Sequence, residues 1–309
     1  MSYQLRNWSE YNAGLKKRGS VTFWLGEDIE STWLETEKTG RRGASLTYSD
    51  LAIITFETIK NVYGMAGRQT EGFIESLFGV MDIDLPVPEH STVCRRKGKL
   101  GVTLPVQPKS GAVHVVVDST GVKVYGEGEW KTRQRGVSKR RTWRKLHLGV
   151  DESTGEILCA VVSGNNVHDS EVLPDILAGV EAEIEQVSAD GAYDTERCYE
   201  ELSERGVKVA IPPQKNAKIW RHRNCQGPPH PRDENLREIR KKGRKGWKRE
   251  SKYHRRSIAE TTMFRLKVIF GGKVRSRKFE NQGTELLLQC AALNRMIQIA
   301  KPDTVWVED

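Results

Sequence analysis

The stretch Val113-His114-Val115-Val116-Val117-Asp118 decides the fold of this chain. It is a short apolar run that ends on a carboxylate, a pattern typical of a strand buried inside a sheet. The next residues, Asp118-Ser119-Thr120-Gly121, favour a turn, and residues 121–125 predict a second strand. Taken alone, Asp118 is explained better as a turn or cap residue than as a ligand.

The residues after this stretch alternate between strand and helix patterns. The predicted elements are a hairpin of strands 143–150 and 156–163, a helix at 170–178, a strand at 184–189, a helix at 194–205 and a strand at 207–211. The order is antiparallel strands, helix, strand, helix, strand. It predicts an α/β protein with a ribonuclease-H-like mixed sheet flanked by helices.

Two carboxylates stand at the ends of predicted strands in this section. Asp118 ends the first strand, and Asp190 directly follows the strand at 184–189. Ligands of open α/β sheets bind at the carboxyl ends of strands, so we expect the two residues to face one site. Two neighbouring carboxylates repel each other unless a cation lies between them. Oxygen ligands of this kind suit Mg²⁺.

A third carboxylate, Glu260, lies in a segment predicted to be one helix from about Ser251 to Phe270. With a rotation of 100° per residue, Tyr253, Arg256, Glu260 and Lys267 fall within roughly 60° of one another. The plain alternative is a solvated polar face. An acid aligned with two cations and a phenol instead favours a phosphate and metal site.

This spacing, Tyr253, two residues, Arg256, three residues, Glu260, six residues, Lys267, resembles the Y-(2)-R-(3)-E-(6)-K signature of bacterial insertion-sequence DDE transposases. The stretches VVVDSTGVKVYG and SADGAYDT are similar to the first and second Asp regions of these enzymes. The resemblance covers roughly residues 110–300 and is greatest to the insertion-sequence-five family.

The resemblance implies a role for each matching residue. Asp118, Asp190 and Glu260 correspond to the catalytic acids, which hold two Mg²⁺ ions with Mn²⁺ as an alternative. Tyr253, Arg256 and Lys267 correspond to residues that contact DNA phosphates. Asp194 competes with Asp190 for the second acid, but its position favours a helix N-cap.

The front of the chain is predicted to be helical. Helical patterns begin at Thr47, at Gln69 and at His90, and the last one carries Arg95 and Arg96. Three short helices with a basic third one predict a helix-turn-helix that reads DNA through these two arginines. A small bundle with a solvated basic face is the alternative.

Domain boundaries follow from a Pro- and Gly-bearing linker at residues 101–110. We predict a DNA-binding region at 1–105 and a catalytic domain at 106–309, with a basic DNA-contacting stretch at 213–250. Residues 213–256 contain 16 Lys or Arg and 4 Asp or Glu. A final helix at about 281–300 is predicted to serve packing.

Composition limits the class of protein. The 309 residues are 37% hydrophobic and 29% charged, which is ordinary for a folded protein. The formal net charge of +9 suits a polyanionic partner. Five dispersed cysteines argue against a disulfide framework, and a zinc site at Cys225 and its histidine neighbours lacks a fourth ligand. Without a signal peptide or membrane-spanning run, we expect a cytoplasmic protein.

The expected function is metal-dependent DNA strand cleavage and strand transfer at the ends of an insertion sequence. The expected partners are double-stranded DNA, both terminal inverted repeats and target, and further copies of the chain in a dimer or higher oligomer on DNA. Two alternatives stay open. One is a ribonuclease-H-like nuclease that only hydrolyses DNA, and the other is a DNA-binding repressor that has lost catalysis.

Overall fold

The computed structural model of the chain describes residues 2–37, 47–124, 143–221 and 229–307. The chain divides into two compact units. One consists of Met1–Pro105 together with Val274–Asp309, and the other is Val106–Lys273. The final 36 residues therefore belong to the same unit as the first 105. We describe each unit by itself.

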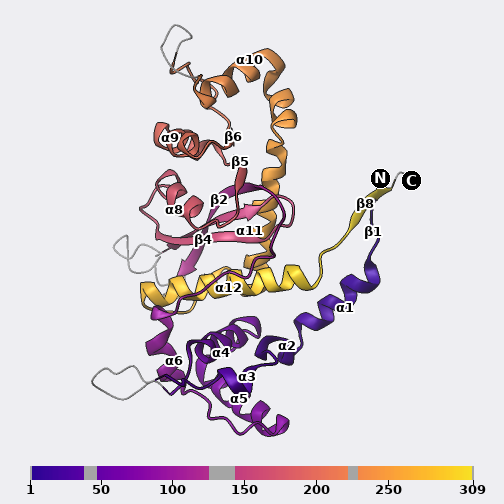
Figure 1. Cartoon of the computed structure of the whole chain (residues 1–309), viewed down its shortest axis with the longest axis vertical. Helices are drawn as coiled ribbons and strands as arrows, with labels where there is room; N and C mark the ends of the chain where they lie inside the picture. The colour runs from indigo at the N-terminus through magenta and orange to yellow at the C-terminus, as the bar shows by residue number, and fades with distance from the viewer. Residues whose placement is uncertain (1, 38–46, 125–142, 222–228, 308–309) are drawn as a thin grey trace, which may run out of the picture. The chain divides into compact units, whose positions relative to one another are not determined.

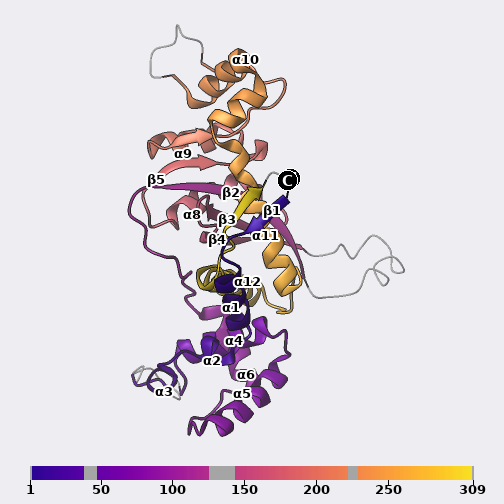
Figure 2. The same ribbon diagram turned by 90° about the vertical axis from the view of Figure 1, so that its right-hand side faces the viewer.

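The second unit contains a mixed sheet with the strand order β4-β3-β2-β5-β6. Strand β3 is antiparallel to both β2 and β4, whereas β5 runs parallel to β2 and β6 runs parallel to β5. Figures 1 and 2 show β2 at the middle of this layer. The bounds are β2 (Val113–Val124), β3 (Trp143–Asp151), β4 (Ile157–Gly164), β5 (Ile184–Ser188) and β6 (Lys208–Ala210). The predicted mixed α/β order is confirmed.

Strand β2 is longer than the sequence predicts. The expected turn after Asp118 and the second strand from Gly121 form one continuous strand, because β3 pairs with β2 through this region. Asp118 therefore lies in the middle of β2 and not at its end. It stands just beyond the last parallel pair, Val116 with Ser188, and so marks the point where the parallel neighbour β5 stops.

Helices cover the sheet on both faces. Helices α8 (Leu173–Ala178) and α9 (Glu196–Glu204) bury Ile176, Leu177 and Tyr199 against the face formed by Val115 and Val117. Helix α11 (Ser257–Phe270) contacts β2 and β3 from the opposite face (Figure 1). Because side chains alternate along a strand, Asp118 points to the α11 side.

The segment before α11 differs from the sequence prediction. The basic stretch contains a helix, α10 (Pro231–Glu250), with a break at Gly243, where φ is 73°. The expected helix from Ser251 is a 3₁₀ turn, η4 (Tyr253–Arg256), followed by α11. The buried stripe of α11 consists of Ala259, Thr262, Met263 and Leu266. Helical spacing from Tyr253 to Glu260 therefore does not hold, since a 3₁₀ turn has a different rise and rotation.

The first unit is mainly helical. The three predicted helices are confirmed as α4 (Asp50–Val62), α5 (Gly67–Met81) and α6 (His90–Arg96), and the last predicted helix as α12 (Phe279–Ile299). The other elements are β1 (Ser2–Leu5), α1 (Trp8–Arg18), α2 (Val21–Leu25), α3 (Ile29–Thr32), η1 (Lys97–Lys99) and β8 (Thr304–Val307). Strand β1 pairs with β8, which brings the two ends of the chain together (Figure 1).

A buried lysine ties α4 and α12 together in this unit. Lys97 Nζ lies 2.6 Å from Glu57 Oε2 and 3.4 Å from Glu285 Oε2, and all three side chains are at most 2% exposed. Burial raises the pKa of Glu285, but Lys97 and hydrogen bonds from Ser276 and Arg275 outweigh this and hold it below the usual value. Buried charges of this kind are tolerated only when they are paired.

Across the described residues, we find no helix that combines the length and apolarity required to span a bilayer.

We predict that Lys97→Met lowers the free energy of unfolding by about 3–5 kcal/mol, because two buried carboxylates lose their shared cation. Lys99→Met, at an exposed position two residues later, is the matched control and should change it by less than about 0.5 kcal/mol. Urea unfolding of the full chain, followed by far-UV circular dichroism, measures both. Equal stability of the two variants would show that the buried cluster contributes nothing.

Candidate active site

Asp118 is the centre of a charged cluster on the α11 side of the sheet. Its Oδ1 accepts the backbone N–H of Ser119 at 2.8 Å, and its Oδ2 accepts from Arg256 Nη1 at 2.7 Å. Burial raises the pKa of Asp118 above its usual value. The Ser119 N–H and Arg256 oppose that rise, while Asp190 and Glu260 add to it by repulsion. Asp190 and Glu260 are therefore both near enough to Asp118 to act on its charge.

Arg256 joins two of these acids. It ends η4, and its Nη2 donates a hydrogen bond to Glu260 Oε1 in the first turn of α11, while Nη1 binds Asp118. Glu260 is 56% exposed, whereas Arg256 is only 20% exposed. Desolvation lowers the pKa of Arg256, but Asp118 and the other nearby groups raise it, with a net upward shift. One guanidinium thus links strand β2 to helix α11.

Asp190 stands two residues after the end of β5. Its Oδ1 accepts the backbone N–H of Ala192 at 2.8 Å, so that it caps the 3₁₀ turn η3 (Gly191–Tyr193). Val116 and Ser188 are partners in the parallel register, and Asp118 and Asp190 each follow two residues later. The two acids therefore lie at the same level of neighbouring chain segments.

Asp194 does not cap a helix, contrary to the sequence prediction. Thr195 caps α9, and the carboxylate of Asp194 accepts from Arg232 Nε at 2.7 Å and from Arg232 Nη2 at 3.3 Å. Both side chains are at most 5% exposed. The guanidinium of Arg232 also lies 3.9 Å from the ring centroid of Trp220. Asp194 therefore serves as a structural partner of α10, which the sequence offered no way to foresee.

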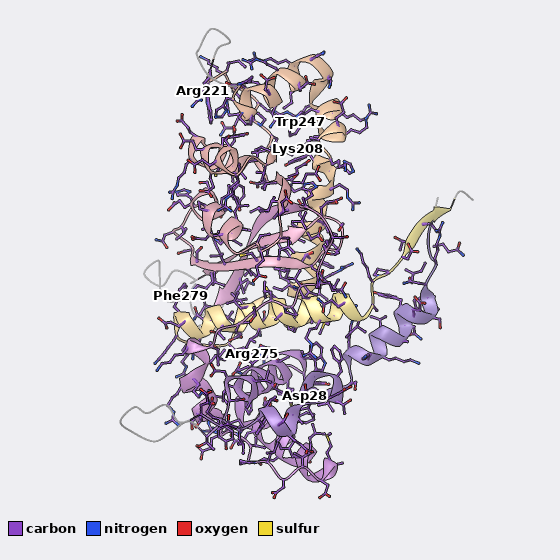
Figure 3. All side chains as sticks on the ribbon, viewed as in Figure 1. Asp28, Lys208, Arg221, Trp247, Arg275 and Phe279 are labelled. Carbon is purple, nitrogen blue, oxygen red and sulfur yellow. The ribbon has the colours of Figure 1, made fainter. Side chains whose placement is uncertain are left out.

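Tyr253 and Lys267 occupy different surroundings. The ring of Tyr253 packs against that of Trp247, 5.6 Å between centroids, and Arg256 lies 5.9 Å from its centre. Figure 3 labels Trp247 on α10. Lys267 lies on α11 nearly two turns after Glu260, roughly 10 Å further along the axis. In the described part of the chain, Lys267 forms no ion pair with the acids.

Arg95 and Arg96 belong to the other unit and differ in exposure. Arg95 is exposed, and its Nη2 donates to Thr92 Oγ1 at 3.0 Å. Arg96 is 13% exposed; it donates to Asp50 Oδ1 at 2.5 Å and to the carbonyl of Tyr48. Arg96 thus holds α6 to the start of α4, and Arg95 is the more accessible of the two.

Tyr193 was not foreseen as a neighbour of the acids. It is 1% exposed, and burial raises the pKa of its phenol far above the usual value, with Asp169, Asp118 and Asp190 adding to the rise. Among the described residues its hydroxyl has no hydrogen-bond partner. The sequence held one clue, a tyrosine three residues after Asp190.

The donor chemistry of the acids fits a divalent cation, since Asp118, Asp190 and Glu260 present hard oxygen atoms. As they stand, no three Asp, Glu, His or Cys side chains among the described residues are grouped closely enough to hold a metal ion. Arg256 lies between two of the acids and supplies positive charge there. The zinc alternative depends on His222 and Cys225, which lie outside the described residues.

Comparison with known proteins identifies the family. A family model described as a transposase DDE domain matches residues 109–295, which is more than half of the chain, and a second model with the same description matches residues 16–127. The chain belongs to the transposase DDE domain family. It is a DDE transposase, a DNA phosphoryl-transfer enzyme that catalyses DNA transposition.

Among solved structures, the transposase is similar to the piggyBac transposase in a synaptic complex with hairpin DNA, determined by cryo-EM. The identity is 11%, the match covers 96% of this chain and 77% of that one, and the TM-score is 0.43.

The two candidate second acids of the transposase should differ in stability effects. We predict that Asp194→Asn lowers the free energy of unfolding by about 3–5 kcal/mol, because buried Arg232 loses its closely paired carboxylate and keeps only Asp233, at 3.9 Å. Asp190→Asn should change it by less than about 0.5 kcal/mol, since asparagine also caps a turn. Urea unfolding measures both variants. If only Asp190→Asn caused a large loss of unfolding free energy, Asp190 would be the structural residue and Asp194 the candidate second acid.

Proposed function

We propose that this transposase cuts and joins the ends of its own insertion sequence, as a member of the insertion-sequence-five family with the Y-(2)-R-(3)-E-(6)-K signature. One observation carries the proposal, the guanidinium of Arg256 bound to both Asp118 and Glu260. It brings the arginine and the glutamate of the signature to the carboxylate of the central strand. The strand order β4-β3-β2-β5-β6 supports a ribonuclease-H-like catalytic domain.

We assign Asp118, Asp190 and Glu260 as the catalytic acids. Together they would hold two Mg²⁺ ions, with Mn²⁺ as an alternative. When bound, the ions supply activation of the attacking oxygen and stabilisation of the leaving oxygen. Burial raises the pKa of Asp118, and repulsion from Asp190 and Glu260 adds to the rise. Added positive charge would relieve this repulsion, which supports the assignment.

The cationic residues of the signature would position DNA. Arg256 can hold two phosphate oxygens in a fork, and it would exchange a carboxylate for phosphate as DNA enters. Lys267 would contribute a point charge further along α11. Tyr253 would offer its hydroxyl as a donor or its ring as a contact surface.

The proposed reaction has two steps. Water attacks the phosphate at the end of the element; a bond forms between the water oxygen and phosphorus, and the bond to the 3′ oxygen breaks. The freed 3′-hydroxyl then attacks a phosphate of target DNA, which releases a 3′ oxygen of the target. The residues position and neutralise the reacting groups, and no covalent enzyme intermediate is needed.

Two surfaces would bind the rest of the DNA. In the basic stretch 213–250, α10 exposes several cations that suit the phosphate backbone: Arg240, Lys241, Lys245, Lys248 and Arg249. Residues 1–105 would form a helix-turn-helix-like region in which Arg95 and Arg96 recognise the terminal repeats. A dimer or higher oligomer on DNA would hold the two ends of one element together.

We predict that Asp118→Asn, Asp190→Asn and Glu260→Gln each lower the cleavage rate by about 100-fold or more. The reason is that the charge developing on the reacting phosphate loses its stabilisation. Binding to the element's end should stay within a few-fold of the unmodified protein. Cleavage of a labelled end in Mg²⁺, with binding measured separately, tests this. Asp175→Asn, at an exposed position of α8, serves as the control. Normal cleavage by any of the three variants removes that residue from the set.

A strand-transfer assay separates transposition from simple hydrolysis. Pre-cleaved ends with a free 3′-hydroxyl should become joined to target DNA, and Glu260→Gln should abolish joining. Hydrolysis without any joining would favour the nuclease. Binding without cleavage in either Mg²⁺ or Mn²⁺ would favour a repressor.

We predict that Arg95→Ala weakens binding of the element's end, because one phosphate or base contact is lost. The slope of log K against log salt concentration should become shallower by about one. Lys16→Ala, an exposed cation of α1, should have little effect. Binding isotherms of the full chain at several salt concentrations measure both. Equal behaviour of the two variants would favour a helical bundle with a solvated basic face.

A further inference from the structure

Of the three large apolar side chains that α11 exposes, Phe264 and Val268 lie together on one face, and Ile269 lies apart from them. Phe264 is 67% exposed and Val268 is 65% exposed, whereas the buried stripe of the helix lies on its other side. With 100° per residue, Phe264 is about 160° around the helix from Leu266, the centre of that stripe. The two residues are one turn apart, so they form a continuous apolar patch on the outer face.

This patch begins one turn after a proposed catalytic acid. Glu260 and Phe264 are four residues apart, which places them about 6 Å apart along the helix axis and within roughly 40° around it. Lys267 is within about 60° of Phe264 on the same face. Arg256 binds Glu260 at the start of the helix. An exposed aromatic ring thus lies between the cations of the signature.

The surroundings indicate which partner covers this ring. Cations on both sides favour a polyanion, and Glu260 is the only acidic residue of α11. DNA combines a polyanionic backbone with flat apolar bases that stack on aromatic side chains. The faces of bases inside a duplex are covered by their neighbours, so contact requires a base that has left the stack.

We propose that Phe264, supported by Val268, is a stacking site for an unpaired base next to the cleaved phosphate of the element's end. The proposal rests on the proposed function, in which Glu260 acts on that phosphate. Phe264 is a positioning residue in this role, because it holds the nucleotide beside the acids and takes no part in bond making.

The experiment places 2-aminopurine at successive positions near a pre-cleaved end and records its fluorescence with the full-length protein. We expect a change confined to one or two positions. Phe264→Ala should remove this change and weaken binding of the end by about 5- to 150-fold. Phe264→Trp should retain both. Ile269→Ala, 37% exposed on the opposite side of the same helix, should behave like the unmodified protein.

Several outcomes overturn the proposal. Unchanged fluorescence and affinity in Phe264→Ala would do so even if the acids are correctly assigned. A change of sedimentation in Phe264→Ala without DNA, with normal fluorescence on DNA, would mean that a second copy covers the patch. Glu260→Gln separates a failure of the stacking proposal from a failure of the proposed function. This variant should keep the fluorescence change but lose cleavage. Full cleavage by Glu260→Gln would refute the proposed function instead.

Discussion

The central position of strand β2 is the constraint on which the rest of the catalytic unit depends. Its backbone pairs with β3 on one edge and with β5 on the other, and both faces are covered by helices. The run Val113–Val117 is apolar except for His114, because side chains covered on both faces have little access to water. Asp118 follows this run at 15% exposure, and its carboxylate finds a polar partner on the α11 side.

Arg256 meets this requirement, and in doing so it sets the position of α11. The guanidinium neutralises Asp118 and reaches Glu260, so a residue late in the chain is attached to the first strand of the sheet. A partly buried pair of this kind must be matched, since a carboxylate without a partner would be protonated or displaced. The same arrangement concentrates negative charge at one point and cations around it, which suits the chemistry of phosphoryl transfer.

In the helical unit, too, buried charges are paired with opposite charges. Lys97 lies between Glu57 and Glu285, and these charges join the front of the chain to its last long helix. Val93 and Leu286 are both buried and belong to the apolar interior of the same unit. The front region is therefore not an independent module of 105 residues, because part of its interior comes from the end of the chain.

The sequence by itself determined the mixed α/β order, the helices of the front region and the family. Apolar runs, helical periods and the spacing from Arg256 to Lys267 are local patterns. Local patterns can be recognised in a sequence without knowledge of the fold. Tertiary structure alone decided that β2 runs through Asp118, because pairing with β3 outweighs a local turn preference. It also decided that Asp194 binds Arg232 and that α12 joins the front unit. These depend on residues far apart in the chain, whose charges and apolar surfaces meet only after folding.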